Sequence, residues 1–159
     1  LPLNYAPLCI NYIRFCVKIN LWQNSYMPTK MPKTEAGWKK KLAPEQYKVL
    51  REKATEPPFT GKYYKAKEPG VYKCAACGNK LFSSKAKFES GTGWPSFSAP
   101  MSEKSIATKL DESGGMERTE VVCPKCGSHL GHVFDDGPEP TGKRYCINSV
   151  ALELEKQKK

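Results

Sequence analysis

Two short cysteine motifs constrain the fold of this 159-residue chain more than any other feature of its sequence. They read CAACG at residues 74–78 and CPKCG at residues 123–127. Two residues between the thiols let both sulfur atoms of a tight turn face one ion, and the following glycine permits the backbone twist of that turn. Two such turns supply four thiolates, the closed tetrahedral set of a structural zinc site. The sequence therefore predicts one structural Zn²⁺ held by Cys74, Cys77, Cys123 and Cys126.

The long separation of the two motifs adds a second constraint. The 45 residues between Cys77 and Cys123 exceed the usual spacing within one small zinc module. The ion is therefore expected to join two hairpins that are distant in sequence and to stabilise the whole domain. The alternative is that either motif is a redox-active dithiol, as in thioredoxin-like proteins. Two matched pairs, each followed by glycine, favour the metal.

Secondary-structure patterning predicts a mainly β domain behind a helical lead-in. Helical periodicity covers residues 35–53, where Pro44 is suited to the first position of a second helix. Strands are expected on both sides of each cysteine motif, and residues 144–154 form a strong β-type run. Residues 98–115 have the composition of a polar linker.

Composition excludes several classes of protein. Hydrophobic residues make up 39% and charged residues 26% of the chain, and no apolar run approaches the roughly 20 residues of a membrane span. The net charge of +10 arises mostly before residue 74, where 14 basic and 5 acidic side chains occur, against 12 and 11 afterwards. A non-enzymatic zinc module that binds nucleic acid or a protein partner is the alternative to an enzyme. Because the basic excess is not clustered around the cysteine motifs, we expect neither nucleic-acid nor membrane binding.

The two ends of the chain are expected to lie outside the folded domain. We assign residues 1–33 to an N-terminal tail, residues 34–155 to the domain and residues 156–159 to a basic C-terminal end. The tail lacks acidic residues, which suits a mitochondrial targeting segment, but a non-native stretch ahead of Met27 or Met31 fits equally. Seven cysteines, four of them in motifs, indicate a reducing compartment. The expected location is the cytoplasm, with the mitochondrion as the alternative.

Cys146 is a thiol outside the two motifs, in the sequence RYCINS. Strand alternation places Arg144, Cys146 and Asn148 on one face of the strand. A guanidinium two residues away can lower a thiol pKa and favour the nucleophilic thiolate. The alternative from this strand alone is a buried, inert cysteine.

The chain has two histidines, His129 and His132, shortly after the second cysteine motif. Their separation puts them on opposite faces of a regular strand, and a bulge at Gly131 would aim both side chains the same way. The acidic pair Asp135 and Asp136 follows at once, which favours proton transfer. A surface histidine, or one that supports the metal ligands, is the alternative for each.

Trp94 lies in the sequence GTGWPSF. The glycines before it free the backbone and the proline after it stiffens it, so the indole can form a pocket wall. A tryptophan in such a place is more often part of the core.

Several of these segments together resemble the methionine sulfoxide reductase B family, the peptide-methionine (R)-S-oxide reductases. The similarity extends roughly from Trp38 to Leu154 and covers the motifs in the family's order. It implies reduction of the R epimer of methionine sulfoxide, mainly in oxidised proteins, as a repair activity. It also implies two packed antiparallel sheets with short N-terminal helices and often a four-cysteine zinc site. The segments that carry it are WKKKLAPEQYKVLREKATEPPFTGKYY, KFESGTGWPSF, HLGHVFDDGP and RYCINS.

The resemblance also implies catalytic roles. Cys146 becomes the nucleophile that attacks the sulfoxide sulfur and is left as a sulfenic acid. His132 becomes the general acid for the departing oxygen and His129 supports it, while Asp136 positions a histidine or a water. A member of the family that keeps the fold but has lost turnover is a further alternative, which the retained Cys146, His132 and Asn148 oppose.

Three further side chains complete the expected site. Arg144 and Asn148 share the face of Cys146 and are suited to stabilise the thiolate and the polar S–O group. Trp94 matches the indole that packs against the substrate methyl group in the family.

One position departs from a common form of the family pattern. Many members carry a resolving cysteine within the GTGWPSF loop, where this chain has Thr92. Cys9 or Cys16 of the tail is one possible substitute; direct reduction of the sulfenic acid by thioredoxin or a small thiol is the expectation that we favour. We expect the protein to act as a monomer.

Overall fold

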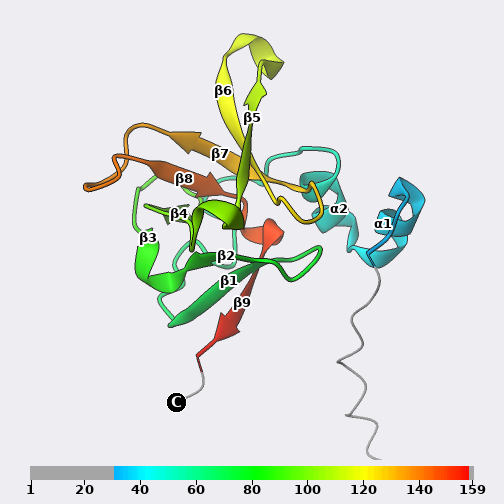
Figure 1. Ribbon diagram of the computed structural model, residues 1–159, viewed down its shortest axis with the longest axis horizontal. Coiled ribbons are helices and arrows are strands. Elements are labelled where there is room, and N and C mark those ends of the chain that lie inside the picture. The colour runs from blue at the N-terminus through cyan, green and yellow to red at the C-terminus, as the bar shows by residue number, and fades with distance from the viewer. Residues whose placement is uncertain (1–30, 158–159) are drawn as a thin grey trace, which may run out of the picture. The chain divides into compact units, whose positions relative to one another are not determined.

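The computed structural model describes residues 31–157, and these residues form two antiparallel β-sheets preceded by two short helices (Figure 1). The helices are α1 (Glu35–Lys41) and α2 (Pro44–Leu50). The strands are β1 (Gly70–Cys74), β2 (Lys80–Ser83), β3 (Lys87–Phe88), β4 (Ser96–Phe97), β5 (Ala107–Asp111), β6 (Arg118–Val122), β7 (His129–Phe134), β8 (Arg144–Ile147) and β9 (Leu152–Lys156). Four single-turn 3₁₀ helices join them: η1 (Ser84–Ala86), η2 (Glu103–Ser105), η3 (Ser113–Gly115) and η4 (Ser149–Ala151). This confirms the predicted mainly β class.

The helical lead-in folds as the sequence predicts. Thr34 caps α1, because its hydroxyl oxygen accepts a hydrogen bond of 3.2 Å from the backbone N–H of Gly37. Pro44 is the first residue of α2, where its missing N–H costs no helical hydrogen bond. Leu42 and Leu50 are buried, so the lead-in packs its apolar stripe onto the domain.

The two sheets divide the strands unequally. The smaller sheet has the order β2-β1-β9, and the larger has the order β3-β4-β8-β7-β6-β5. Strand β8 lies between β4 and β7, with Cys146 opposite Ser96 on one side and opposite His132 on the other. Figure 1 shows the β5–β6 hairpin projecting from the end of the larger sheet.

The strong β-type run predicted for residues 144–154 forms two strands, with a break between them that the sequence does not predict. β8 ends at Ile147, η4 follows, and β9 belongs to the smaller sheet. At the break, the backbone N–H groups of Ser149 and Val150 donate to the carboxylate of Glu56 instead of to a neighbouring strand. Both halves of the run keep β-type residues, so local propensity does not reveal the break.

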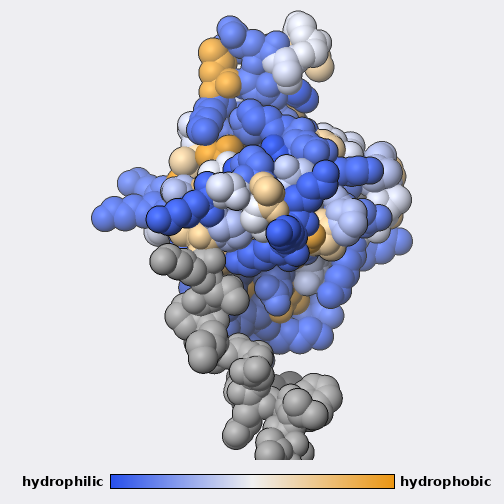
Figure 2. All heavy atoms as spheres, turned by 90° about the vertical axis from the view of Figure 1, so that its right-hand side faces the viewer, coloured by the Kyte–Doolittle hydropathy of each residue, from blue (hydrophilic) through white to orange (hydrophobic). Residues whose placement is uncertain are grey.

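The predicted polar linker at residues 98–115 is also wrong in part, because it contains β5. This edge strand pairs with β6 along its whole length, but none of its residues is fully buried. Leu110 on β5 and Met116 in the following turn are each 61% exposed. Figure 2 shows apolar colour on this hairpin above a largely hydrophilic face. A strand that buries so few side chains has the composition of a loop.

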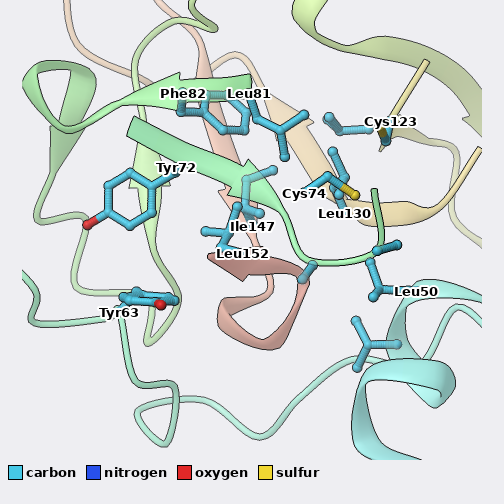
Figure 3. Packing of buried hydrophobic residues seen from close by; sticks show 14 of the residues in the cluster. Leu50, Tyr63, Tyr72, Cys74, Leu81, Phe82, Cys123, Leu130, Ile147 and Leu152 are labelled. Carbon is cyan, nitrogen blue, oxygen red and sulfur yellow. The ribbon is translucent and has the colours of Figure 1, made fainter. Parts of the chain in front are cut away.

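The core lies between the two sheets. Phe82 of the smaller sheet stacks on Phe97 of the larger, with ring centroids 4.4 Å apart, and Tyr72 meets Phe97 edge-on at 5.1 Å. Figure 3 shows Tyr72, Phe82 and Ile147 among the packed apolar side chains, and all three are fully buried. Contacts of this kind hold the two sheets together by removing large aromatic surfaces from water.

In residues 31–157, no helix has both the length and the apolar character needed to cross a membrane.

Candidate active site and metal centre

The four motif cysteines converge on one point, as predicted. Their sulfur atoms all lie within 4.8 Å of one another. Cys74 Sγ is 3.7 Å from Cys126 Sγ, and Cys77 Sγ is 3.6 Å from Cys123 Sγ. Four sulfurs around an ion at Zn–S distances of about 2.3 Å would be separated by about 3.8 Å. The donor set therefore has the chemistry and the dimensions of a tetrahedral thiolate metal site.

The local backbone explains why both motifs need glycine. Gly78 and Gly127 adopt φ values of +73° and +70°, in the left-handed region. In this conformation each glycine N–H donates a hydrogen bond of 2.8 Å to the carbonyl of the first motif cysteine, Cys74 or Cys123. The turn is closed by these bonds, and its two thiols then face the same side.

The metal site connects the two sheets. The first motif joins β1 to β2 in the smaller sheet, and the second joins β6 to β7 in the larger. Arg51, just after α2, donates a hydrogen bond of 3.0 Å to the carbonyl of Cys126 and brings the helical lead-in to the same place. An ion bound here would cross-link segments that are far apart in the chain, as the motif spacing predicts.

Cys146 lies at a separate pocket of about 130 Å³. Strand β8 places its thiol there, with the aromatic side chains of Trp94 and Phe134 and the imidazole of His132 among the walls. Asn148, two residues further along, lines the same pocket, as strand alternation predicts.

Opposing influences act on the Cys146 thiol. Burial raises its pKa and outweighs the positive charge of Arg144, which acts in the opposite direction. Hydrogen bonds from the side chains of Thr92 and Arg144 also favour the thiolate. The predicted effect of Arg144 is present, but the pKa of Cys146 stays above that of an ordinary thiol.

Arg144 is fixed by an acidic partner. Its Nε and its Nη2 donate hydrogen bonds of 2.8 and 2.9 Å to the two carboxylate oxygens of Asp136. Its guanidinium lies 4.5 Å from the centroid of the Phe134 ring. The pairing lowers the pKa of Asp136 and raises that of Arg144. Asp136 thus binds the arginine: it lies two residues beyond Phe134, the last residue of β7, which is opposite Arg144. A role for Asp136 in positioning a histidine or a water stays a prediction.

Other carboxylates hold the two histidines. His132 Nε2 lies 2.7 Å from Asp111 Oδ2, and His129 Nδ1 lies 2.7 Å from Glu120 Oε1. Burial lowers the pKa of His129, although Glu120 opposes this shift. Burial would raise the pKa of Glu120, but hydrogen bonds from Lys53 and His129 outweigh it and the pKa lies below its ordinary value. Each histidine of β7 therefore has its own acidic partner: Glu120 on the adjacent strand β6 for His129, and Asp111 on β5, one strand further away, for His132.

Both imidazoles face the same side, with ring centroids 5.4 Å apart. The β6–β7 register shifts here: Val121 is opposite Gly131, but Val122 is opposite His129, so one β7 residue is skipped. The predicted irregularity is present. Gly131 itself has another role, since a Cβ there would lie 2.0 Å from the carbonyl oxygen of Cys146. Only glycine lets β7 approach β8 this closely.

Asn148 and Trp94 are both held by one residue, Glu56, to which the sequence analysis assigned no role. Asn148 Oδ1 accepts a hydrogen bond of 3.1 Å from the backbone N–H of Glu56, and Asn148 Nδ2 donates one of 3.1 Å to the carbonyl of Leu130. Trp94 Nε1 donates a hydrogen bond of 3.0 Å to the carbonyl of Glu56. The loop after α2 thus holds two walls of the pocket, Asn148 and Trp94, through hydrogen bonds to the backbone of Glu56.

Comparison with known proteins decides the family. The SelR domain matches residues 42–156 of this chain. The "Peptide methionine sulfoxide reductase MsrB" of Methanosarcina barkeri (strain Fusaro / DSM 804) is 65% identical over 122 residues, which cover 77% of this chain and 86% of that protein. The protein of the same name from Leptospira interrogans (strain 56601) is 58% identical over 125 residues, 79% of this chain and 95% of that protein.

The chain belongs to the methionine sulfoxide reductase B family.

Within this methionine sulfoxide reductase B domain, the predicted site residues form two groups. One is the metal site. The other gathers at Cys146: Trp94, His132 and Asn148 line its pocket. Behind them, His129 lies against His132, Arg144 lies on the ring of Phe134 and Asp136 binds Arg144.

Sequence patterns missed the residues that orient this second group. Asp111 was hidden in the supposed linker, and Glu120 gave no signal beyond being a charged residue within an apolar strand. Thr55, which lines the pocket, and Glu56 belong to a loop rich in proline that carried no catalytic pattern. The predicted tail and its Cys9 and Cys16 lie outside the described residues, except for residues 31–33.

Proposed function

We propose that this protein reduces methionine (R)-sulfoxide in oxidised proteins to methionine, with Cys146 as the nucleophile and a thiol as the final reductant. The observation that carries the proposal is the position of the Cys146 thiol. In a chain of this family, it lies in a small pocket with an indole, a phenyl ring and a carboxylate-bound imidazole among the walls. Such a pocket suits a methyl sulfide group with a polar oxygen.

The chemical step transfers one oxygen atom. The Cys146 sulfur attacks the sulfoxide sulfur and forms an S–S bond, while the S–O bond of the substrate breaks and its oxygen leaves, once protonated, as water. A water molecule then attacks the Cys146 sulfur, the S–S bond breaks and methionine leaves with the electron pair. Cys146 ends as a sulfenic acid, so its sulfur is oxidised by two electrons and the methionine sulfur is reduced by two. The guanidinium of Arg144 stabilises the thiolate as it forms, which offsets part of the penalty of burial.

The departing oxygen must be protonated, because an oxide is a poor leaving group. We assign this proton transfer to His132, which lines the pocket. Its bond to Asp111 holds the ring in place. His129 lies behind His132 and supports it without reaching the pocket.

Regeneration of Cys146 requires an external thiol in this proposal. Thr92 forms a hydrogen bond with the Cys146 thiol, at the place where many family members have a second cysteine. A hydroxyl cannot form a disulfide, so two thiol groups of thioredoxin or of a small reductant reduce the sulfenic acid. The products are the Cys146 thiol, one disulfide and water.

We further propose that the four-cysteine site holds one structural Zn²⁺. Four thiolates in closed tetrahedral geometry suit this ion, which does not undergo redox chemistry in proteins. When bound, it supplies cross-linking between the sheets. The motif cysteines are not among the residues lining the Cys146 pocket.

Separate assays of the two sulfoxide epimers test the proposal. Wild-type protein and Cys146→Ser are each given the R or the S epimer of a methionine sulfoxide peptide, with dithiothreitol as reductant. We expect wild-type protein to consume only the R epimer and Cys146→Ser to consume neither, because a hydroxyl is a far weaker nucleophile. Unchanged metal content in the variant shows that the fold is retained. A folded, metal-loaded wild-type protein that consumes neither epimer contradicts the proposal and favours a binding module.

A further inference from the structure

Glu56 is a buried acidic residue with no part in the chemistry described so far. It is 7% exposed and lies in the loop between α2 and β1. Its Oε1 accepts a hydrogen bond of 2.6 Å from the N–H of Ser149, and its Oε2 accepts one of 3.0 Å from the N–H of Val150. The carboxylate therefore binds the start of η4, immediately after Asn148.

The backbone of the same residue holds two walls of the pocket. Its N–H donates to the Asn148 side chain at 3.1 Å, and its carbonyl accepts from the Trp94 indole at 3.0 Å. Thr55, its neighbour, lines the pocket itself. Moving the backbone of Glu56 would therefore displace the amide, the indole and a third wall residue together.

The surroundings leave the carboxylate little freedom to move. A Cβ at Gly61 would lie 2.7 Å from Glu56 Oε1 and 2.5 Å from the Cβ of Ser149. No cation pairs with Glu56 within residues 31–157, so only backbone N–H groups compensate its charge. Burying a carboxylate without a cation costs free energy. In return, its two hydrogen bonds hold the loop at a fixed distance from the segment after Cys146.

We propose that Glu56 is the positioning residue of the sulfoxide pocket: its carboxylate anchors the loop to η4, and its backbone thereby holds Asn148 and Trp94 in place for the substrate. This inference rests on the proposed function for its catalytic readout. Glu56 is not assigned a proton-transfer role, because both carboxylate oxygens are engaged by backbone N–H groups and the residue does not line the Cys146 pocket.

This role predicts which properties change when the Glu56 carboxylate is removed. Without the carboxylate, the loop can move away from η4, and Trp94 and Asn148 lose their shared partner. Substrate binding then suffers, and a misplacement of about 1 Å can cost up to about a hundredfold in rate. Arg144 and Thr92 shift the pKa of the Cys146 thiol, and in residues 31–157 Glu56 forms its hydrogen bonds with other residues. We therefore expect the intrinsic reactivity of Cys146 to be unchanged.

The test compares Glu56→Ala and Glu56→Gln with wild type and with the matched control Glu52→Gln, which changes an exposed glutamate of the same loop. Three readouts are taken on metal-loaded protein. They are kcat and KM for a methionine (R)-sulfoxide peptide, the alkylation rate of Cys146 by iodoacetamide, and the indole N–H resonance of Trp94, assigned with Trp94→Phe.

For Glu56→Ala we expect KM to rise about tenfold or more, the Trp94 indole resonance to move, and the alkylation rate to stay at the wild-type value. Glu56→Gln keeps one carbonyl acceptor, so its KM and its Trp94 indole resonance should lie between those of Glu56→Ala and wild type. If Glu56→Ala does not fold, the same measurements on Glu56→Gln test the proposal. Glu52→Gln should match wild type throughout.

An unmoved indole resonance with unchanged KM, even at a lower melting temperature, overturns the proposal, because Glu56 would then contribute to stability alone. Failure of the proposed function is a separate outcome. In that case wild type shows no turnover of either epimer, whereas the indole resonance still reports whether Glu56 positions Trp94.

Discussion

The side chains around Cys146 work in pairs, and each pair joins two strands or a strand and a loop. Arg144 forms hydrogen bonds with Asp136, and His132 forms one with Asp111. The Thr92 side chain acts on the Cys146 thiol, and its Oγ1 lies 2.8 Å from the Oγ of Ser90. A single change at this scale therefore affects one partner directly, which makes the roles separable by substitution.

The first prediction concerns Thr92. In Thr92→Cys, the introduced thiol lies beside Cys146 and should form a disulfide with it after one turnover without reductant. Wild type should instead keep a sulfenic acid that dimedone traps. Counting free thiols before and after one equivalent of substrate, and mapping the linked peptides, distinguishes the two. A wild-type disulfide between Cys146 and Cys9 or Cys16 would contradict direct reduction by an external thiol.

The second prediction concerns pH and His129. Its pKa in the folded protein lies below the ordinary value near 6.5 because the ring is buried, beside Glu120, Lys53 and His132. Below pH 6.5 the unfolded chain binds a proton that the folded protein excludes, so the free energy of unfolding falls as pH falls. His129→Gln removes this contribution. Between pH 7.5 and 5.5, the urea midpoint should decline less steeply with falling pH in the variant than in wild type. Equal declines in the two proteins would refute the role of His129 in this pH dependence.

At the scale of elements, the site depends on how closely β7 and β8 approach. His132 lies opposite Cys146, and Gly131 beside it leaves room for the Cys146 carbonyl. The register shift between β6 and β7 falls in the same part of β7. The break after β8 matters equally, since it turns the chain at Asn148 towards the loop containing Glu56.

The third prediction tests this approach. Gly131→Ala places a methyl group against backbone that cannot move aside, so it should cost about 2 kcal/mol or more of stability and most of the activity. The control Gly114→Ala lies in the β5–β6 turn, where a Cβ meets nothing within 4 Å but φ is +71°. It should cost about 1 kcal/mol and keep activity. Thermal melts and the epimer assay check both; equal effects would contradict the steric argument.

At the scale of the whole molecule, the metal site connects two sheets that otherwise meet through their apolar faces. Cys74 and Cys123 are buried and part of the hydrophobic cluster, so the site is continuous with the core (Figure 3). A cross-link between distant segments stabilises the fold by restricting the unfolded chain.

The fourth prediction follows from this connection. Cys123→Ser should release the metal and lower the free energy of unfolding, by about 4 kcal/mol if the ion acts as a cross-link closing a loop of roughly 50 residues. Metal analysis and denaturant titration measure the two effects. Cys146→Ser is the matched cysteine control and should keep both metal and stability. A Cys123→Ser protein with full metal content and normal melting would rule out the structural role.

The sequence by itself determined the features that depend on neighbouring residues. The cysteine spacing with its following glycine specifies a turn, Pro44 specifies a helix start, and alternation around Cys146 places Arg144 and Asn148 on its face, because each follows from backbone geometry over a few residues.

Only the tertiary structure decided which distant groups meet. Asp136 binds Arg144, Asp111 binds His132, and Glu56 holds Asn148. Each pairing depends on the register of strands or on the path of a loop between segments far apart in the chain. Local patterns carry no record of that register, because many partners are compatible with the same run of β-forming residues. The packing of the two sheets selects one of them.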